Sequence, residues 1–147
     1  MFRGRYEHAI DAKGRVSLPA RYRDALAGLQ EDVLVATTSD EPCLRAYPLR
    51  AWRDFEEKLA SKPQMNPAVR RLMRHYVGNA QECTIDGMGR VLVPPSLREY
   101  AGIERDVVFL GQVNFVEVWS RERWEKAQSN VLEHLTEDLR VLAEFEV

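Results

Sequence analysis

Ten residues decide the fold, and they occur twice: Ile10–Pro19 reads IDAKGRVSLP, and Ile85–Pro94 reads IDGMGRVLVP, 75 residues later. In each copy an Asp in the second position is followed three residues on by a Gly. This spacing suits a type I turn followed by a left-handed residue, a common way to close a short hairpin. Both copies therefore predict a tight β-hairpin, with Asp11 and Gly14 forming the first turn and Asp86 and Gly89 the second.

The repeat continues beyond the turns. Arg23 matches Arg98 at the same offset, and Tyr47 and Trp52 match Trp119 and Trp124 at an offset of 72. Each half predicts a hairpin, a short helix opened by a proline, two more strands and a closing helix. The later elements are expected at Val33–Thr37, Leu44–Tyr47 and Leu49–Ser61, and at Val107–Leu110, Phe115–Trp119 and Arg121–Leu142.

Four short strands cannot enclose a core alone, whereas two copies related by a pseudo-two-fold axis can. The predicted fold class is α+β, with two hairpin units packed as one small barrel or sandwich, short helices and a C-terminal helix. We expect a first half at 1–61, a connecting helix within 62–78, a second half at 79–127 and a helical extension at 128–147. Asn66 and Pro67 form a helix start before the predicted helix Ala68–Val77.

Length and charge bound the function. The chain has 147 residues and a formal net charge of −2, which by itself argues against a nucleic-acid binder. That sum hides an uneven distribution. Six bases and two acids give residues 1–23 a charge of +4, four bases without an acid give residues 62–78 also +4, and residues 104–147 carry −5. A clustered positive face can attract phosphate on an acidic protein, although a solvated face is the simpler interpretation of such a cluster.

Several classes of function find no support. The three histidines are scattered singly and the two cysteines, Cys43 and Cys83, form no C-x-x-C, so we expect no metal and no cofactor. Two cysteines suit a reducing cytoplasm, and no apolar run could span a bilayer. Asp11 and Asp86 could resemble a carboxylate pair sharing a proton, but each has an Arg four residues on, and no nucleophile–base or phosphate-binding motif occurs. We expect no catalytic residue and no small-molecule substrate.

The residue after each turn glycine suggests another role. Hairpin chemistry accounts for the Asp and the Gly but does not require the Arg that follows in both copies. Lys13 and Arg15 on the first turn, with Arg3 and Arg5 close in sequence, could contact phosphates or guanine edges of double-stranded DNA. The second turn has Met88 where the first has Lys13. Arg90 is therefore a weaker DNA-binding candidate, and the second turn could instead serve packing or subunit contacts.

These motifs resemble one family over nearly the whole chain. Met1-Phe2-Arg3-Gly4, the paired Asp-x-x-x-Arg turns, Pro19 with Arg21-Tyr22-Arg23, Tyr47-Pro48-Leu49 and Met65-Asn66-Pro67 are similar to the MraZ family. The resemblance implies two tandem AbrB-like, swapped-hairpin units. It further implies a transcriptional regulator, usually a repressor, that binds tandem short repeats upstream of the division and cell-wall gene cluster containing its own gene. It also implies a homo-oligomeric ring, a cytoplasmic and nucleoid-associated location, and DNA contacts made by Arg15 foremost and Lys13 beside it.

Two questions stay open in the sequence. The chain could be an antitoxin-like interaction module whose acidic C-terminal helix binds a partner, because Glu133, Glu137, Asp138, Glu144 and Glu146 gather there. Arg70, Arg71 and Arg74 could contact DNA or could simply form a solvated helix face.

Overall fold

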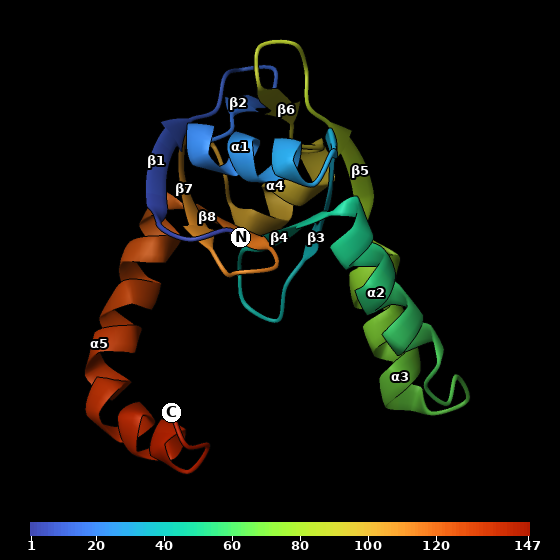
Figure 1. Ribbon diagram of the computed structural model, residues 1–147, viewed down its shortest axis with the longest axis vertical. Coiled ribbons are helices and arrows are strands. Elements are labelled where there is room, and N and C mark those ends of the chain that lie inside the picture. Colours follow the sequence, from blue (N-terminus) through green and yellow to red (C-terminus); the bar gives the residue numbers. More distant parts are fainter.

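The computed structural model describes residues 1–147 as one α+β molecule (Figure 1). The first half comprises β1 (Arg5–Ala9), β2 (Arg15–Ser17), α1 (Ala20–Gly28), β3 (Val33–Thr38), β4 (Leu44–Pro48) and α2 (Leu49–Ala60). The second half repeats this order with β5 (Gln81–Thr84), β6 (Arg90–Leu92), α4 (Pro95–Ala101), β7 (Asp106–Gly111), β8 (Val116–Ser120) and α5 (Arg121–Ala143). Between them lie α3 (Pro67–Leu72) and a π-helical turn, η1 (Met73–Val77).

The two halves exchange their N-terminal strands. A six-stranded antiparallel sheet has the order β1-β7-β8-β4-β3-β5, so β1 of the first half pairs with β7 of the second, and β5 of the second pairs with β3 of the first. The strands that follow, β2 and β6, pair with each other in a separate two-stranded ribbon. Each half therefore completes its sheet with a strand from the other.

The strand register places a pseudo-two-fold axis through the molecule. Val16 lies opposite Val91 in the ribbon, and these two residues are equivalent at the 75-residue offset. Arg45 lies opposite Glu117 where β4 meets β8, and these two are equivalent at the 72-residue offset. The axis thus passes through the centre of the ribbon and the centre of the sheet, and relates every element of one half to its counterpart.

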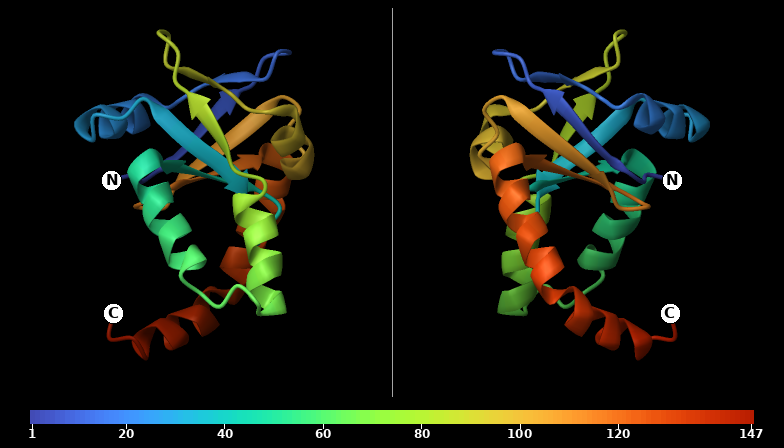
Figure 2. Two further views of the ribbon diagram at one scale, coloured as in Figure 1. Left: turned by 90° about the vertical axis from the view of Figure 1, so that its right-hand side faces the viewer. Right: turned by 90° about the vertical axis from the view of Figure 1, so that its left-hand side faces the viewer.

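The core fills the space between the sheet, the ribbon and the helices α1 and α4. It contains twenty buried residues drawn from both halves, among them Val16 and Val91 from the ribbon and Tyr22, Leu26 and Leu97 from the two helices. Burying large apolar side chains contributes about 1.5–3 kcal/mol each. Because the core is shared, neither half could bury these side chains alone. In Figure 2 the two hairpin turns project beyond this core at one end of the molecule, and α2, α3 and α5 extend from the other.

The predicted small barrel is wrong in one respect, because the six-stranded sheet does not close. Its edge strands, β1 and β5, pair with β7 and β3 but not with each other. Each edge strand runs on through its turn into β2 or β6, and those two strands pair across the axis instead. The ribbon and the two short helices therefore cover the core where a barrel would need β1 to meet β5.

The helix boundaries follow the expected capping chemistry. The Ser120 hydroxyl accepts a hydrogen bond from the Arg123 amide at the start of α5, and the Asn66 side chain accepts one from the Ala68 amide at the start of α3. The connecting helix departs from expectation in its second part, which is π-helical from Met73 to Val77. None of the helices combines the length and the apolarity needed to cross a bilayer.

Candidate nucleic-acid interface

The first turn is held by its own aspartate. One carboxylate oxygen of Asp11 accepts hydrogen bonds from the amides of Lys13 and Arg15, both at 2.9 Å. The other oxygen accepts the Arg15 Nε–H at 2.8 Å, and the Gly14 amide donates to the Asp11 carbonyl at 3.0 Å. The Asp11 carboxylate thus fixes both the backbone of the turn and the Nε end of the Arg15 guanidinium. The Arg15 Nη atoms form no hydrogen bond within the chain.

The two halves support each other beneath the turns. Gly14 has φ +89°, and a Cβ there would lie 2.8 Å from Cζ of Arg98, whose Nε donates to the Val93 carbonyl. The Gly14 carbonyl accepts the Val93 amide at 2.8 Å. A glycine is needed for both reasons, because its φ is left-handed and because the Arg98 guanidinium fills the space of a side chain.

The second turn repeats this geometry closely. Asp86 accepts the amides of Met88 and Arg90 at 2.9 Å and the Arg90 Nε–H at 3.0 Å. Gly89 has φ +76°, and a Cβ there would lie 2.6 Å from Cδ of Arg23, the counterpart of Arg98. The two turns therefore have one backbone design, and they differ only in the side chains that they carry.

The turns continue into the ribbon, which presents one face outward. Val16 and Val91 point into the core, so the alternation of side chains along a strand turns Arg15 and Ser17 of β2 outward, with Arg90 and Leu92 of β6. Arg15 lies opposite Leu92, and Arg90 lies opposite Ser17. A two-stranded ribbon of this size fits the major groove of B-DNA, and its outward face carries two arginines at diagonal positions of the ribbon.

Charge distinguishes the two turns. The first turn exposes the charged side chain of Lys13. The second turn exposes an uncharged side chain at the same position, Met88, which is 71% exposed. Glu31 and Asp32 line the same shallow hollow as Asp86, so acids border the second turn. The first turn is thus the more attractive of the two to phosphate, although the backbone geometry is shared.

The carboxylates of Asp11 and Asp86 stay ionised to a lower pH than an ordinary aspartate does. The pKa of Asp11 is lowered chiefly by the hydrogen bond from the Arg15 amide, and the pKa of Asp86 by that from the Arg90 amide. Two carboxylates sharing a proton would show one strongly raised pKa instead. Each carboxylate is bound to its own turn, which leaves no proton-sharing pair at this site.

Arg3 and Arg5 do not lie beside Lys13 and Arg15. Arg5 opens β1, where it pairs with Leu110, and the strand then runs five residues, about 17 Å, before the turn begins. The backbone of Arg3 passes close to Gly111, at the same far end of β1. Both arginines are exposed, but they belong to a different part of the surface from the first turn.

Arg98 and Arg23 were missed as contributors to the turns. The signal was present, because these two residues match at the same 75-residue offset as the turns themselves. Each lies under the glycine of the opposite hairpin, a relation that follows from the strand exchange.

Arg70, Arg71 and Arg74 lie exposed on α3 and η1, at the end of the molecule opposite the hairpin turns (Figure 2).

The remaining candidates for chemistry are structural. Cys43 and Cys83 are buried free thiols, and burial raises the pKa of Cys43 to about 12 and that of Cys83 to about 11. The His75 ring contacts the Ser39 carbonyl at 2.6 Å. No three His, Cys, Asp or Glu residues are grouped as a metal site would require.

Comparison with known proteins agrees with the repeat. A family model described as "MraZ protein, putative antitoxin-like" matches the chain twice, over residues 1–75 and 76–142. The first match covers the first half with α3 and part of η1, and the second begins at the end of η1, just before β5; together they span most of the molecule.

Individual relatives are similar over nearly their whole length, and each is named as a transcriptional regulator, MraZ. The protein of Alkalilimnicola ehrlichii is 45% identical over 139 residues, which cover 94% of this chain and 93% of that protein. That of Heliobacterium modesticaldum is 42% identical over 147 residues and covers all of both chains. That of Lachnoclostridium phytofermentans is 39% identical over 145 residues, 99% of this chain and 97% of that protein.

Proposed function

The chain belongs to the MraZ family of transcriptional regulators, which are not enzymes, and on that premise we propose that it binds double-stranded DNA through its first turn and the β2–β6 ribbon. The observation that supports this most is the first turn itself. Asp11 holds Arg15 by its Nε and leaves both Nη atoms for an external partner.

A held arginine is well suited to read DNA. A guanidinium with two free amino groups can donate to O6 and N7 of one guanine or to a phosphate. Arg15 would lose little side-chain freedom on binding DNA, because Asp11 already holds its Nε. Lys13, exposed two residues before it, would add a phosphate contact. Arg90 sits on the same outward ribbon face with Met88 and acids nearby, so we assign it the weaker contact.

Arg3 and Arg5 take a secondary place in this proposal. They lie at the far end of β1 from the turn, so they could reach only a phosphate outside the contact made by the ribbon.

We propose the following division of the chain into domains. Residues 1–61 and 79–127 are two AbrB-like, swapped-hairpin halves, 62–78 is the connection and 128–147 is the extension, with α5 running unbroken across residue 127.

A single contact patch would bind weakly. Two or three basic side chains on one subunit give a salt-sensitive affinity for DNA that does not select one site. We propose that subunits form a homo-oligomeric ring and that two or more of them engage tandem short repeats at once, so that avidity supplies the selectivity. Head-to-tail contacts that close make such rings.

The genes that we propose as targets are those that membership of the family suggests. We propose that the protein represses the division and cell-wall gene cluster that includes its own gene, acting in the cytoplasm on the nucleoid. No membrane, cofactor or small-molecule substrate enters this proposal.

A mobility-shift assay tests it. DNA from upstream of the gene is titrated with the native protein and with Arg15→Ala, and the native protein alone should shift it at low concentration. Inserting half a helical turn, about 5 base pairs, between two repeats rotates one box to the far side of the duplex and should weaken native binding sharply. Equal binding by Arg15→Ala, or an affinity insensitive to the insertion, would contradict the corresponding half of the proposal.

A further inference from the structure

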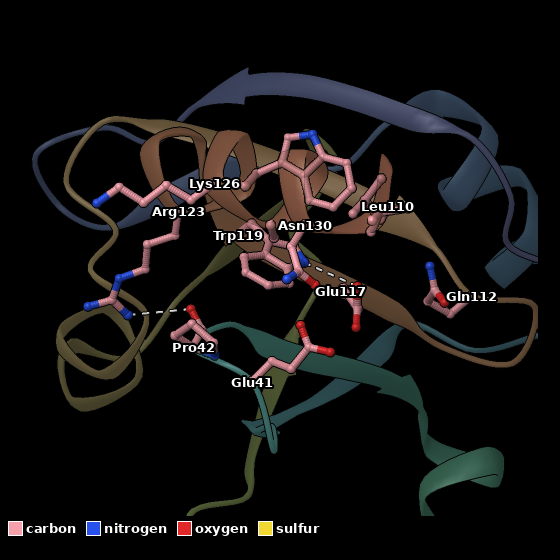
Figure 3. A pocket seen from close by; sticks show the side chains of 12 residues that line it. Glu41, Pro42, Leu110, Gln112, Glu117, Trp119, Arg123, Lys126 and Asn130 are labelled. Atoms are coloured by element: carbon pink, nitrogen blue, oxygen red, sulfur yellow. Dashed lines mark hydrogen bonds between the residues drawn. The ribbon is translucent and has the colours of Figure 1, made fainter. Parts of the chain in front are cut away.

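An open groove runs along one side of α5 (Figure 3). It has a volume of about 830 Å³ and lies between the first turns of α5, the strands β7 and β8, and the segment Glu41–Pro42. Apolar side chains form part of its wall: Leu110, Trp119, Trp124, Ala127 and Val131. Most of its lining comes from β7, β8 and α5, and Figure 1 shows the start of α5 away from the hairpin turns.

The equivalent place in the first half is filled by a helix. There η1 packs on α2 and the sheet: the Thr37 hydroxyl donates to the Tyr76 carbonyl at 2.6 Å, and the rings of Phe55 and Tyr76 meet edge to face with centroids 5.6 Å apart. Phe55 in turn stacks on Tyr47 at 5.8 Å. Three first-half positions, Thr37, Tyr47 and Phe55, therefore form the seat on which η1 rests.

All three counterparts of that seat line the groove. The pseudo-two-fold axis relates Thr37 to Leu110, Tyr47 to Trp119 and Phe55 to Ala127. The second half has no helix corresponding to α3 and η1, so Leu110 and Ala127 stay half-exposed in the groove, beside a Trp119 that its own chain already buries. The small side chain of Ala127, where the first half has Phe55, leaves additional room. The internal symmetry thus indicates that the groove is shaped for a helix.

One helical segment of the chain lacks a packing partner. Every residue from Ser129 onward is exposed, although α5 continues to Ala143 (Figure 2). Val131, Leu135, Leu139 and Leu142 recur at intervals of four, four and three residues, which places them on one face of the helix. Such a stripe normally packs against another surface. We call these four residues the distal stripe.

We propose that the distal stripe of one copy occupies the α5 groove of a second copy. The segment Val131–Ala143 is about 20 Å long, slightly more than the Pro67–Val77 segment that fills the equivalent place in the first half. Beyond Val131 the segment leaves its own groove behind, because α5 bends but continues as one helix away from the body (Figures 1 and 2). Glu133, Glu137 and Arg140 lie on the opposite face of the helix and would stay in water.

This contact would supply the subunit interface on which the proposed ring depends. The groove and the distal stripe share only Val131 and otherwise lie on different parts of the chain, so their union is heterologous and can be repeated from copy to copy. The inference concerns association alone and makes no use of DNA, so its failure would leave the role of Arg15 unaffected.

Sedimentation of the full chain without DNA tests the proposal. Leu135→Arg with Leu139→Arg puts two charges into the stripe, while the matched control, Ser129→Arg with Thr136→Arg, adds the same charges to the polar face. All four positions are exposed in a single copy, so the body should fold in both proteins. We expect the stripe variant to sediment as a 17.0 kDa monomer and the control to sediment like the native oligomer. Identical sedimentation of the two variants, or a native protein that is monomeric, would overturn the inference.

A cross-link locates the contact. One chain carries Ala127→Cys and a second carries Cys at Leu135, Leu139 or Leu142 in turn, and the native Cys43 and Cys83 are buried and do not compete. Ala127 and Leu139 of one helix are about 18 Å apart, beyond the reach of a disulfide, so a link between them joins two chains. At least one pair should form a mixed disulfide on mild oxidation. If none forms while the native protein is oligomeric, another surface makes the interface and the proposal is wrong.

Discussion

Replacing Gly14 by alanine tests how the two halves depend on each other. The residue has φ +89°, and a Cβ there would come within 2.8 Å of the Arg98 guanidinium, which belongs to the other half. Two costs therefore arise at one site. The backbone must hold a conformation that alanine disfavours, and Arg98 must move away from the hydrogen bond that its Nε makes with the Val93 carbonyl.

The magnitude follows from those two costs. A left-handed alanine costs about 1–2 kcal/mol relative to glycine. Losing the Arg98 hydrogen bond costs up to about 1.5–3 kcal/mol, less where the flexible guanidinium finds a new partner. The lower conformational entropy of the unfolded alanine chain offsets about 0.4–1 kcal/mol. We expect a net loss of roughly 2–4 kcal/mol, or a fall in Tm of roughly 5–15 °C for a chain of this length.

Thermal melts at one protein concentration measure this loss. Gly28→Ala is the matched control, because a Cβ at Gly28 meets nothing within 4 Å, and it should melt at or slightly above the native Tm. Adding Arg98→Ala to Gly14→Ala should remove the steric part and leave the backbone part, which a double-mutant cycle separates. If Gly14→Ala melts within 1 °C of the native protein, our account of the turn is refuted.

Two further predictions concern stability. The lowered pKa of Asp11 and Asp86 means that their contribution to stability is fully present above the unfolded pKa, near 4, and is lost as the pH falls through the folded value. The difference in Tm between the native protein and the double variant Asp11→Asn with Asp86→Asn should therefore shrink below about pH 4, and an equal difference at pH 7 and pH 2.5 would contradict it. Tyr22→Phe removes the hydroxyl that donates to the Gly4 carbonyl at 2.8 Å and should cost about 1 kcal/mol in denaturant unfolding. An unchanged unfolding midpoint would show that this buried hydroxyl contributes nothing.

The sequence predicted most of the local structure. Because hairpin turns and helix caps depend on a few neighbouring residues, the Asp-x-x-Gly spacing and the Ser120 and Asn66 caps could be recognised directly. The strand at Leu44–Pro48 and the helix at Arg121–Ala143 end within one residue of expectation. These elements are specified locally, and the hairpin turn and the strands that follow it occur in both halves, as the repeat predicts.

The relation between the halves was harder to predict. Antiparallel pairing of β1 with β7 joins residues about 100 positions apart, and nothing near Arg5 indicates Leu110 as its partner. The same is true of Arg98 under Gly14, which only the exchanged strands bring together. The separation of Arg3 and Arg5 from the turn follows from the length of β1, whereas closeness in sequence had suggested one patch.

Equilibrium binding of two symmetry-related variants tests the central claim most directly. Arg15→Ala and Arg90→Ala each remove one solvent-screened ion pair of about the same geometry, so their thermal stabilities should agree. Measured by fluorescence anisotropy on one operator duplex at fixed salt, Arg15→Ala should lose about 1–3 kcal/mol of binding per contact, roughly 5–150-fold, and Arg90→Ala less. Native affinity in Arg15→Ala, or a larger loss in Arg90→Ala, would contradict the assignment of DNA binding to the first turn.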